Sequence, residues 1–272
     1  MRLSGVVLAR SAGSRLGAVT ACSESLAIRL AGAALSLDIH KNALDETIKG
    51  SRDWHYDDRP SCEPTVPRTE YCPAGNCASV QLKRHYGILI DSEASPARKR
   101  FAIRVIAHLA GDVHQPLHAS DHDDVGGNIK LTGNWMVKPN LHSAWDTDFV
   151  SRAFAGPDFK NKSEQQIAAA LLNQVTDVNK QEWAKGPITA WLQQSYDLAV
   201  KLTYGQLPGF TCQVANFEAK PVTLTDDYIN ASVAEIPVQL QRGGVRLAAI
   251  LNRALSSGDD TTSSTFVRAD KL

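Results

Sequence analysis

Apolar residues recur at helical spacing along most of this 272-residue chain, and no stretch shows the alternation of a strand. The strongest pattern begins at Ser95-Pro96, because proline is tolerated in the first turn of a helix, and Pro116 should disturb or end it. Pro237 is expected to delay the start of the last helix. The expected helices cover residues 26–48, 78–89, 96–115, 141–153, 163–175, 188–202 and 231–255. The predicted fold class is all-α.

The polar stretches set the expected domain limits. Residues 51–76 hold four prolines and are expected to form an irregular loop, as are residues 121–133 and 208–222. We expect one helical domain over residues 41–256, preceded by an atypical, poorly ordered segment (1–40) and followed by a flexible Ser/Thr/Asp tail (257–272).

Charge and hydropathy argue against a general attraction to nucleic acid and against insertion across a membrane. Lys+Arg and Asp+Glu both number 29, so no overall basic field would attract nucleic acid, and any such affinity must be local or arise from metal ions. No run of about 18 apolar residues is present, so no membrane span is expected.

The five cysteines bear on the compartment. Cys72 and Cys77 could close a small loop as a disulfide, or remain reduced and packed; a zinc knuckle is disfavoured because no second close pair occurs. A disulfide would imply export to an oxidising compartment. A signal peptide is not recognisable, since Arg10 and Arg15 interrupt the first apolar stretch.

Histidines and aspartates are concentrated between residues 108 and 146. His108 and Asp112 stand four residues apart, as do His142 and Asp146, and this spacing places both side chains on one helix face. For one such pair, the simpler interpretation would be a histidine in the core whose hydrogen bond is made to the aspartate. Two pairs, with His118 nearby, favour a metal site, and imidazole with carboxylate is the ligand set of a catalytic zinc site.

The other histidines carry less information. His114 should face away from the ion, and His122 with its neighbouring aspartates 121, 123 and 124 is expected to be solvated loop. His40 and His85 are expected at the surface. His55 lies in the dense segment Trp54-His55-Tyr56-Asp57-Asp58, where it could be a ligand beside a base-stacking ring and a hydrogen-bonding carboxylate.

These motifs resemble a known family. His108-x-x-x-Asp112-x-x-x-x-x-His118, then Gly126-Gly127-Asn128, then Asn140-Leu141-His142-x-x-x-Asp146 resembles the zinc-dependent single-strand-specific nucleases of the mung bean nuclease type. Zinc phospholipases C are their more distant relatives. The resemblance implies a mostly helical fold with three zinc ions in a cleft, and cleavage of RNA and single-stranded DNA to 5′-mononucleotides with removal of 3′-phosphates.

The resemblance also implies roles for individual residues. Metal ligands would be His55, His108 and Asp112 at one ion, with Asp112 bridging to a second, and His118, His142 and Asp146 at another. Tyr56 and Asp58 would bind a nucleobase, and Asn128 would lie beside the cleft. The implied disulfides are Cys62 with Cys212 and Cys72 with Cys77. The fifth cysteine, Cys22, has no implied partner.

The chain departs from the family pattern upstream of residue 50. The family's segment with an aspartate ligand and a catalytic arginine matches residues 43–49 only loosely. Asp45 or Glu46 would be the ligand, and the two are not separated by the sequence. Lys49 would replace the arginine as a catalytic point charge. The family's initial tryptophan and following histidine have no counterpart in residues 1–40, so we expect two zinc ions rather than three.

The expected function is a zinc-dependent phosphodiesterase acting on single-stranded nucleic acid, in which zinc lowers the pKa of a bound water from ~15.7 toward ~7. A phospholipase C-like lipid phosphodiesterase and an inactive metal-binding remnant are the alternatives. No protein partner is inferred.

Overall fold

The computed structural model describes residues 50–133, 140–213 and 220–256. Several expectations fall outside these ranges. They are the helix over 26–48, the ligands Asp45 and Glu46, the catalytic Lys49, the positions of Cys22 and His40, and the tail over 257–272.

The described chain is mostly helical, as predicted, with two short strands. In chain order its elements are η1 (Ser51–His55), β1 (Arg59–Pro60), α3 (Arg68–Tyr71), η2 (Pro73–Gly75), α4 (Ala78–Ile90), α5 (Pro96–Asp112), η3 (Pro116–His118), β2 (Ser120–Asp121), α6 (Leu141–Ser143), η4 (Ala144–Asp148), α7 (Phe149–Ala153), α8 (Glu164–Asn173), α9 (Asp177–Trp183), α10 (Ile188–Leu198), η5 (Ala199–Thr203) and α11 (Asp226–Ser256). Of these, η4 and η5 are π-helical and η1, η2 and η3 are 3₁₀ turns.

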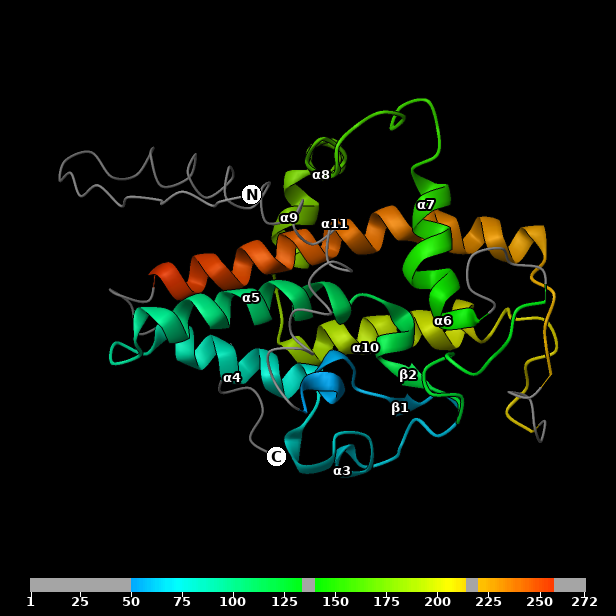
Figure 1. Cartoon of the computed structure of the whole chain (residues 1–272), viewed down its shortest axis with the longest axis horizontal. Coiled ribbons are helices and arrows are strands. Elements are labelled where there is room, and N and C mark those ends of the chain that lie inside the picture. The colour runs from blue at the N-terminus through cyan, green and yellow to red at the C-terminus, as the bar shows by residue number, and fades with distance from the viewer. Residues whose placement is uncertain (1–49, 134–139, 214–219, 257–272) are drawn as a thin grey trace.

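Helix α11 runs along the molecule, with α5 and α4 beside one half and α6–α7 against the other (Figure 1). One core lies among α4, α5, α10 and α11, and includes Tyr86, Leu109 and Trp191. A second core lies around α6–α7, η5 and the start of α11, and includes Trp145 and Tyr228. The α5–η3 segment is therefore held on both sides by packed helices.

Helix α5 forms where its sequence predicts it. The Ser95 hydroxyl accepts a hydrogen bond from the Arg98 backbone N–H at 3.3 Å, and Pro96 occupies the first turn. The helix ends at Asp112, ahead of Pro116, which opens η3. This break turns His118 away from the helix axis, as expected.

The pairing of β1 with β2 brings η1 to η3. The two strands are parallel, with Arg59 opposite Ser120 and Pro60 opposite Asp121. Beside them, the Asp57 backbone N–H donates to the His118 carbonyl at 2.8 Å. Residues far apart in the sequence, including His55 and His118, thus lie on neighbouring segments.

The expectation about Pro237 is wrong. Helix α11 already begins at Asp226, and Pro237 lies inside it. The Thr225 hydroxyl accepts a hydrogen bond from the Tyr228 N–H at 3.2 Å, which caps the helix start. An internal proline costs a helix about 3 kcal/mol. Packing of Tyr228 and Ile236 in the second core, and of Leu247 in the first, offsets this cost.

Two further expectations need correction. Residues 51–76 contain the short elements η1, β1, α3 and η2 rather than continuous irregular loop. The sequence pattern also missed α9, whose N-terminus is capped by the Thr176 hydroxyl, which accepts from the Asn179 N–H. With seven residues, this helix is too short for a clear apolar period.

Both disulfides implied by the resemblance are present. Cys62 pairs with Cys212 and Cys72 with Cys77, with Cα–Cα distances of 5.5 Å and 5.3 Å. The first joins the loop after β1 to the chain after η5, and the second closes the turn before α4. Within the described ranges, no helix combines the length and apolar character that a bilayer crossing requires.

Candidate metal centre

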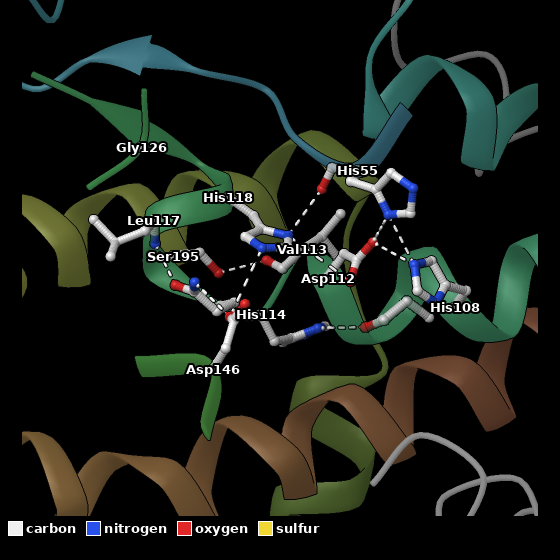
Figure 2. A network of polar contacts seen from close by, with 12 residues as sticks. His55, His108, Asp112, Val113, His114, Leu117, His118, Gly126, Asp146 and Ser195 are labelled. Carbon is white, nitrogen blue, oxygen red and sulfur yellow. Dashed lines mark hydrogen bonds and ion pairs between the residues drawn. The ribbon is translucent and has the colours of Figure 1, made fainter. Parts of the chain in front are cut away.

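Three ligand atoms from two distant segments form the first group, which consists of His55, His108 and Asp112. The Asp112 Oδ2 atom lies 2.9 Å from His55 Nδ1 and 3.1 Å from His108 Nε2, and the two nitrogens are 2.8 Å apart. Figure 2 shows the imidazoles from η1 and α5 converging on the Asp112 carboxylate. Helical spacing predicted the His108–Asp112 pair and the family resemblance implied His55 beside it, and in the structure the three side chains lie together.

The second group, His118, His142 and Asp146, has similar geometry. His142 Nε2 lies 3.2 Å from both Asp146 Oδ2 and His118 Nε2, and His118 Nε2 lies 3.9 Å from Asp146 Oδ1. Helix α6 carries His142, and the π-helical turn η4 that follows it carries Asp146. All six side chains of the two groups are buried or largely buried.

Backbone carbonyls determine which nitrogen each histidine of the second group offers. His118 Nδ1–H donates to the His55 carbonyl at 3.0 Å, and His142 Nδ1–H donates to the Gly126 carbonyl at 2.7 Å. In a neutral imidazole this bond leaves Nε2 as the nitrogen with the free lone pair, and in both residues Nε2 faces Asp146. A hydrogen bond from the second ring nitrogen is the usual support of a metal-ligating histidine.

The pKa values of the two aspartates are governed by these imidazoles. Burial alone would raise the pKa of Asp112, but His108, His55 and His118 outweigh it and hold that pKa well below its usual range. Burial likewise acts to raise the pKa of Asp146, and His142 and His118 lower it overall. Both carboxylates are therefore ionised and available as ligands at neutral pH.

The residues of both groups fit zinc. Within each group the three ligand atoms lie within 4.8 Å of one another. Zinc binds nitrogen and carboxylate oxygen at about 2.0–2.2 Å, so tetrahedral ligand atoms stand roughly 3.3–3.5 Å apart, within the range of the 2.8–3.9 Å spacings here. Two imidazoles and one carboxylate leave a coordination position for water or substrate, as in catalytic zinc sites.

A third set of candidate ligand atoms, on Asp57, Cys72 and Cys77, does not form a metal site. The two cysteines are joined in a disulfide and offer no thiolate. Asp57 instead accepts from the Ser79 N–H at 2.8 Å and the Ser79 hydroxyl at 2.6 Å, and lies 3.5 Å from Arg68. It stabilises the start of α4.

The loop over 121–133 is not simply solvated, contrary to expectation. Asp124 is fully buried and accepts from the Gly127 N–H and the Tyr204 hydroxyl, both at 2.7 Å. Asp121 accepts from the Gly126 N–H at 2.7 Å. The two carboxylates therefore hold the Gly126-Gly127 turn that supports His142. His122 is also packed, against Phe210 at 4.8 Å between ring centroids.

Of the implied base-binding residues, Asp58 and Asn128 lie at the same turn. An atom added at the Cβ position of Gly126 would lie 3.8 Å from Asp58 Oδ1 and 3.7 Å from His142 Nδ1, so Asp58 is next to the second group. Burial, and then Asp121, raises the pKa of Asp58 to about 8. Tyr56 is half-buried and donates to Asp53 at 3.0 Å. Asn128 is exposed and donates to the Val125 carbonyl.

Two other histidines are structural. His114 points away from both groups, as expected: Nδ1–H donates to the Ala110 carbonyl, and Nε2 accepts from the buried Arg246 at 2.7 Å. Burial and this guanidinium lower the pKa of His114 to about 3. His85 is buried rather than at the surface, because it packs between Trp54 and Phe101 and donates to the Gln81 carbonyl.

Sequence reasoning missed Gln115. Its side-chain N–H donates to Asp146 Oδ1 at 2.9 Å, across 31 residues of sequence. Its only signal in the sequence was its position between His114 and Pro116 within the histidine motif. A cavity of about 130 Å³ borders this pair, and its other walls include Trp145, Ile236 and Leu240.

Comparison with known proteins identifies related chains. The sequence profile of the S1/P1 nuclease family matches residues 12–256. Endonuclease 4 of Arabidopsis thaliana is 32% identical over 158 residues, 57% of this chain and 51% of that protein. Endonuclease 2 of the same plant is 33% identical over 156 residues, 56% of this chain and 51% of that protein. Nuclease P1 of Penicillium citrinum is 24% identical over 216 residues, 75% of this chain and 77% of that protein. The alignments span about half the length of the two plant relatives.

Proposed function

Since this chain belongs to the S1/P1 nuclease family, we propose that its paired His/Asp groups bind zinc and hydrolyse phosphodiester bonds of single-stranded DNA and RNA. The observation that supports this most directly is the convergence of two imidazole–imidazole–carboxylate sets from η1, α5, η3 and α6–η4. A nuclease is also what the names of the related proteins describe.

Within the proposal, each side chain has a defined task. Zinc ions would polarise the phosphate and lower the pKa of a bound water, so that hydroxide is available at neutral pH. Asp112 is the carboxylate of the first group and the candidate bridge to a further ion, since its second oxygen, Oδ1, lies on the side of His118, 3.8 Å from the Nδ1 atom of that ring. Of the residues outside the described ranges, Asp45 or Glu46 would add a ligand, and Lys49 would offset charge on the phosphate oxygens.

The single-strand preference would come from a nucleobase site. Tyr56 offers a ring for stacking and Asp58 a carboxyl group for hydrogen bonding, with Asn128 on the turn beside them. A base must leave the helical stack to reach such a site, so duplexes would be poor substrates. The proposed products are 5′-mononucleotides, and removal of 3′-phosphates would use the same ions.

Two measurements test this proposal. Zinc analysis of the purified chain should give about two ions, the number that two three-residue ligand sets can hold. Single-stranded DNA, RNA and a 3′-nucleotide should be hydrolysed, whereas duplex DNA and phosphatidylcholine should not. Preferential cleavage of phosphatidylcholine would instead support the phospholipase C alternative. Zinc binding without hydrolysis of any of these substrates would support the alternative that the chain is an inactive metal-binding remnant.

We also propose that the protein works outside the reducing cytosol. The two disulfides support this, because such bonds persist in oxidising compartments. Fractionation of cells expressing the complete gene would test it, and a purely cytosolic protein with reduced cysteines would contradict it.

A further inference from the structure

We propose that Gln115 is a positioning residue that orients Asp146 for the ion of the second group; this rests on the proposed function, because it presumes that the group binds metal. The relevant contact is the 2.9 Å hydrogen bond from Gln115 Nε2 to Asp146 Oδ1. Asp146 Oδ2, the other oxygen, is the one that faces His142 Nε2 at 3.2 Å.

The two carboxylate oxygens therefore differ in their surroundings: Oδ2 faces His142, whereas Oδ1 accepts from Gln115 and lies 3.9 Å from His118 Nε2. A carboxylate on a short side chain can rotate and present either oxygen to an ion. The hydrogen bond to Oδ1 resists that rotation and keeps Oδ2 directed at His142 Nε2. Partners of this kind around a metal ligand typically change metal affinity or activity by about 10–100-fold when removed.

The Gln115 amide is itself held in one orientation. Its Oε1 atom accepts from the Leu117 backbone N–H at 2.5 Å, and a carbonyl oxygen is required there. The NH₂ group must therefore be the end that faces Asp146. A glutamate at this position could still accept from Leu117, but it would place a second carboxylate against Asp146.

Gln115 is also tied to the rest of the centre through the backbone. Its N–H donates to the Asp112 carbonyl at 3.0 Å, and it caps η3, whose last residue is His118. It is thus anchored to segments carrying a ligand of the first group and a ligand of the second. The other ligands of the second group, His118 and His142, receive their support from carbonyls instead.

The test compares Gln115→Glu and Gln115→Ala with wild type, and uses Gln239→Ala as the matched control. Gln239 lines the same cavity, but its amide donates to Glu235 rather than to Asp146. Zinc affinity would be measured by competition with a chromogenic chelator. Circular dichroism and thermal unfolding of the zinc-free proteins would show whether each variant is folded.

We expect one of two zinc ions to bind about 10–100-fold more weakly in both Gln115 variants, with the other ion unaffected. Gln239→Ala should bind both ions as wild type does. If wild type binds two ions and Gln115→Glu binds them equally tightly, the positioning role is refuted while the metal centre stands. If folded wild type binds no zinc, the proposed function and this inference both fall. Should Gln115→Ala unfold, the isosteric glutamate variant decides the question.

Discussion

Gly126 and His142, 16 residues apart, are joined by a 2.7 Å hydrogen bond from the imidazole Nδ1–H to the glycine carbonyl. The carbonyl is in position because Gly126 adopts a φ of 58°, a left-handed conformation that glycine reaches without steric cost. Asp121 and Asp124 hold the turn from its other side. The geometry of one proposed metal ligand thus depends on a glycine and on the carboxylates of Asp121 and Asp124.

Gly126→Ala should disturb the second group. A Cβ atom there would approach the Leu117 carbonyl oxygen to 2.8 Å, in a conformation that alanine disfavours. We expect a stability loss of about 1–3 kcal/mol from this strain. We also expect zinc affinity of the second group to fall about 10–100-fold, since the support of His142 moves. Urea unfolding and zinc competition would measure the two effects.

Gly87→Ala is the matched control. Gly87 lies inside α4, and a Cβ atom there would have nothing within 4 Å. This change should stabilise the protein by about 0.5–1 kcal/mol and leave zinc binding unchanged. Equal behaviour of the two alanine variants would contradict the role given to the Gly126 turn.

Asp112→Asn should remove the ion of the first group. The amide keeps the shape of the side chain but loses the negative charge that balances the cation beside His55 and His108. Zinc content should fall from about two ions to about one. Hydrolysis of single-stranded DNA should fall by more than about 100-fold, since an ion contributes several kcal/mol to the transition state. Asp123→Asn, at an exposed position nearby, should retain both properties. Full activity of Asp112→Asn would refute its role as a ligand.

Tyr204→Phe should destabilise the protein in a pH-dependent way. It removes the hydroxyl that donates to buried Asp124 at 2.7 Å, which should cost about 1–3 kcal/mol near pH 7. Burial raises the pKa of Asp124, and the Tyr204 hydrogen bond counteracts that rise, so the variant should have a still higher pKa.

The sign follows from proton linkage. A carboxyl group whose pKa is raised on folding binds protons more tightly in the native state, so its charged form weakens stability above the native pKa. The penalty of Tyr204→Phe should therefore shrink as the pH falls through the native pKa toward the unfolded value of about 3.9. Urea unfolding between pH 4 and pH 8 would measure this trend. A penalty that grows on acidification would contradict it.

The two disulfides should differ in their contribution to stability. Cys62 and Cys212 are 150 residues apart, whereas Cys72 and Cys77 are 5 apart. By chain entropy the longer link should contribute about 5 kcal/mol and the shorter about 2 kcal/mol. Thermal unfolding of the Cys62→Ser/Cys212→Ser and Cys72→Ser/Cys77→Ser double variants would compare them. A larger loss in the second variant would show that the short link acts through native contacts instead.

Helices with clear apolar periods and caps, and the spacing of the ligand pairs, could be predicted from the amino-acid order alone. Ser95-Pro96 marked α5, and the four-residue intervals placed His108 with Asp112 and His142 with Asp146, because a helix puts such positions on one face. These properties are local, so they can be read from neighbouring residues alone. The disulfide pairs and the role of His55 came instead from the family resemblance.

Contacts between distant segments depend instead on how the whole chain packs. Packing in the two cores carried α11 through Pro237, which the local pattern predicted as a delayed start. The hydrogen bonds from Gln115 to Asp146 and from His142 to Gly126 cross long stretches of sequence, and no spacing rule connects those residues. His85 and Asp124 are buried for the same reason: burial depends on which segments the fold brings against a residue, and the sequence around it does not contain that information.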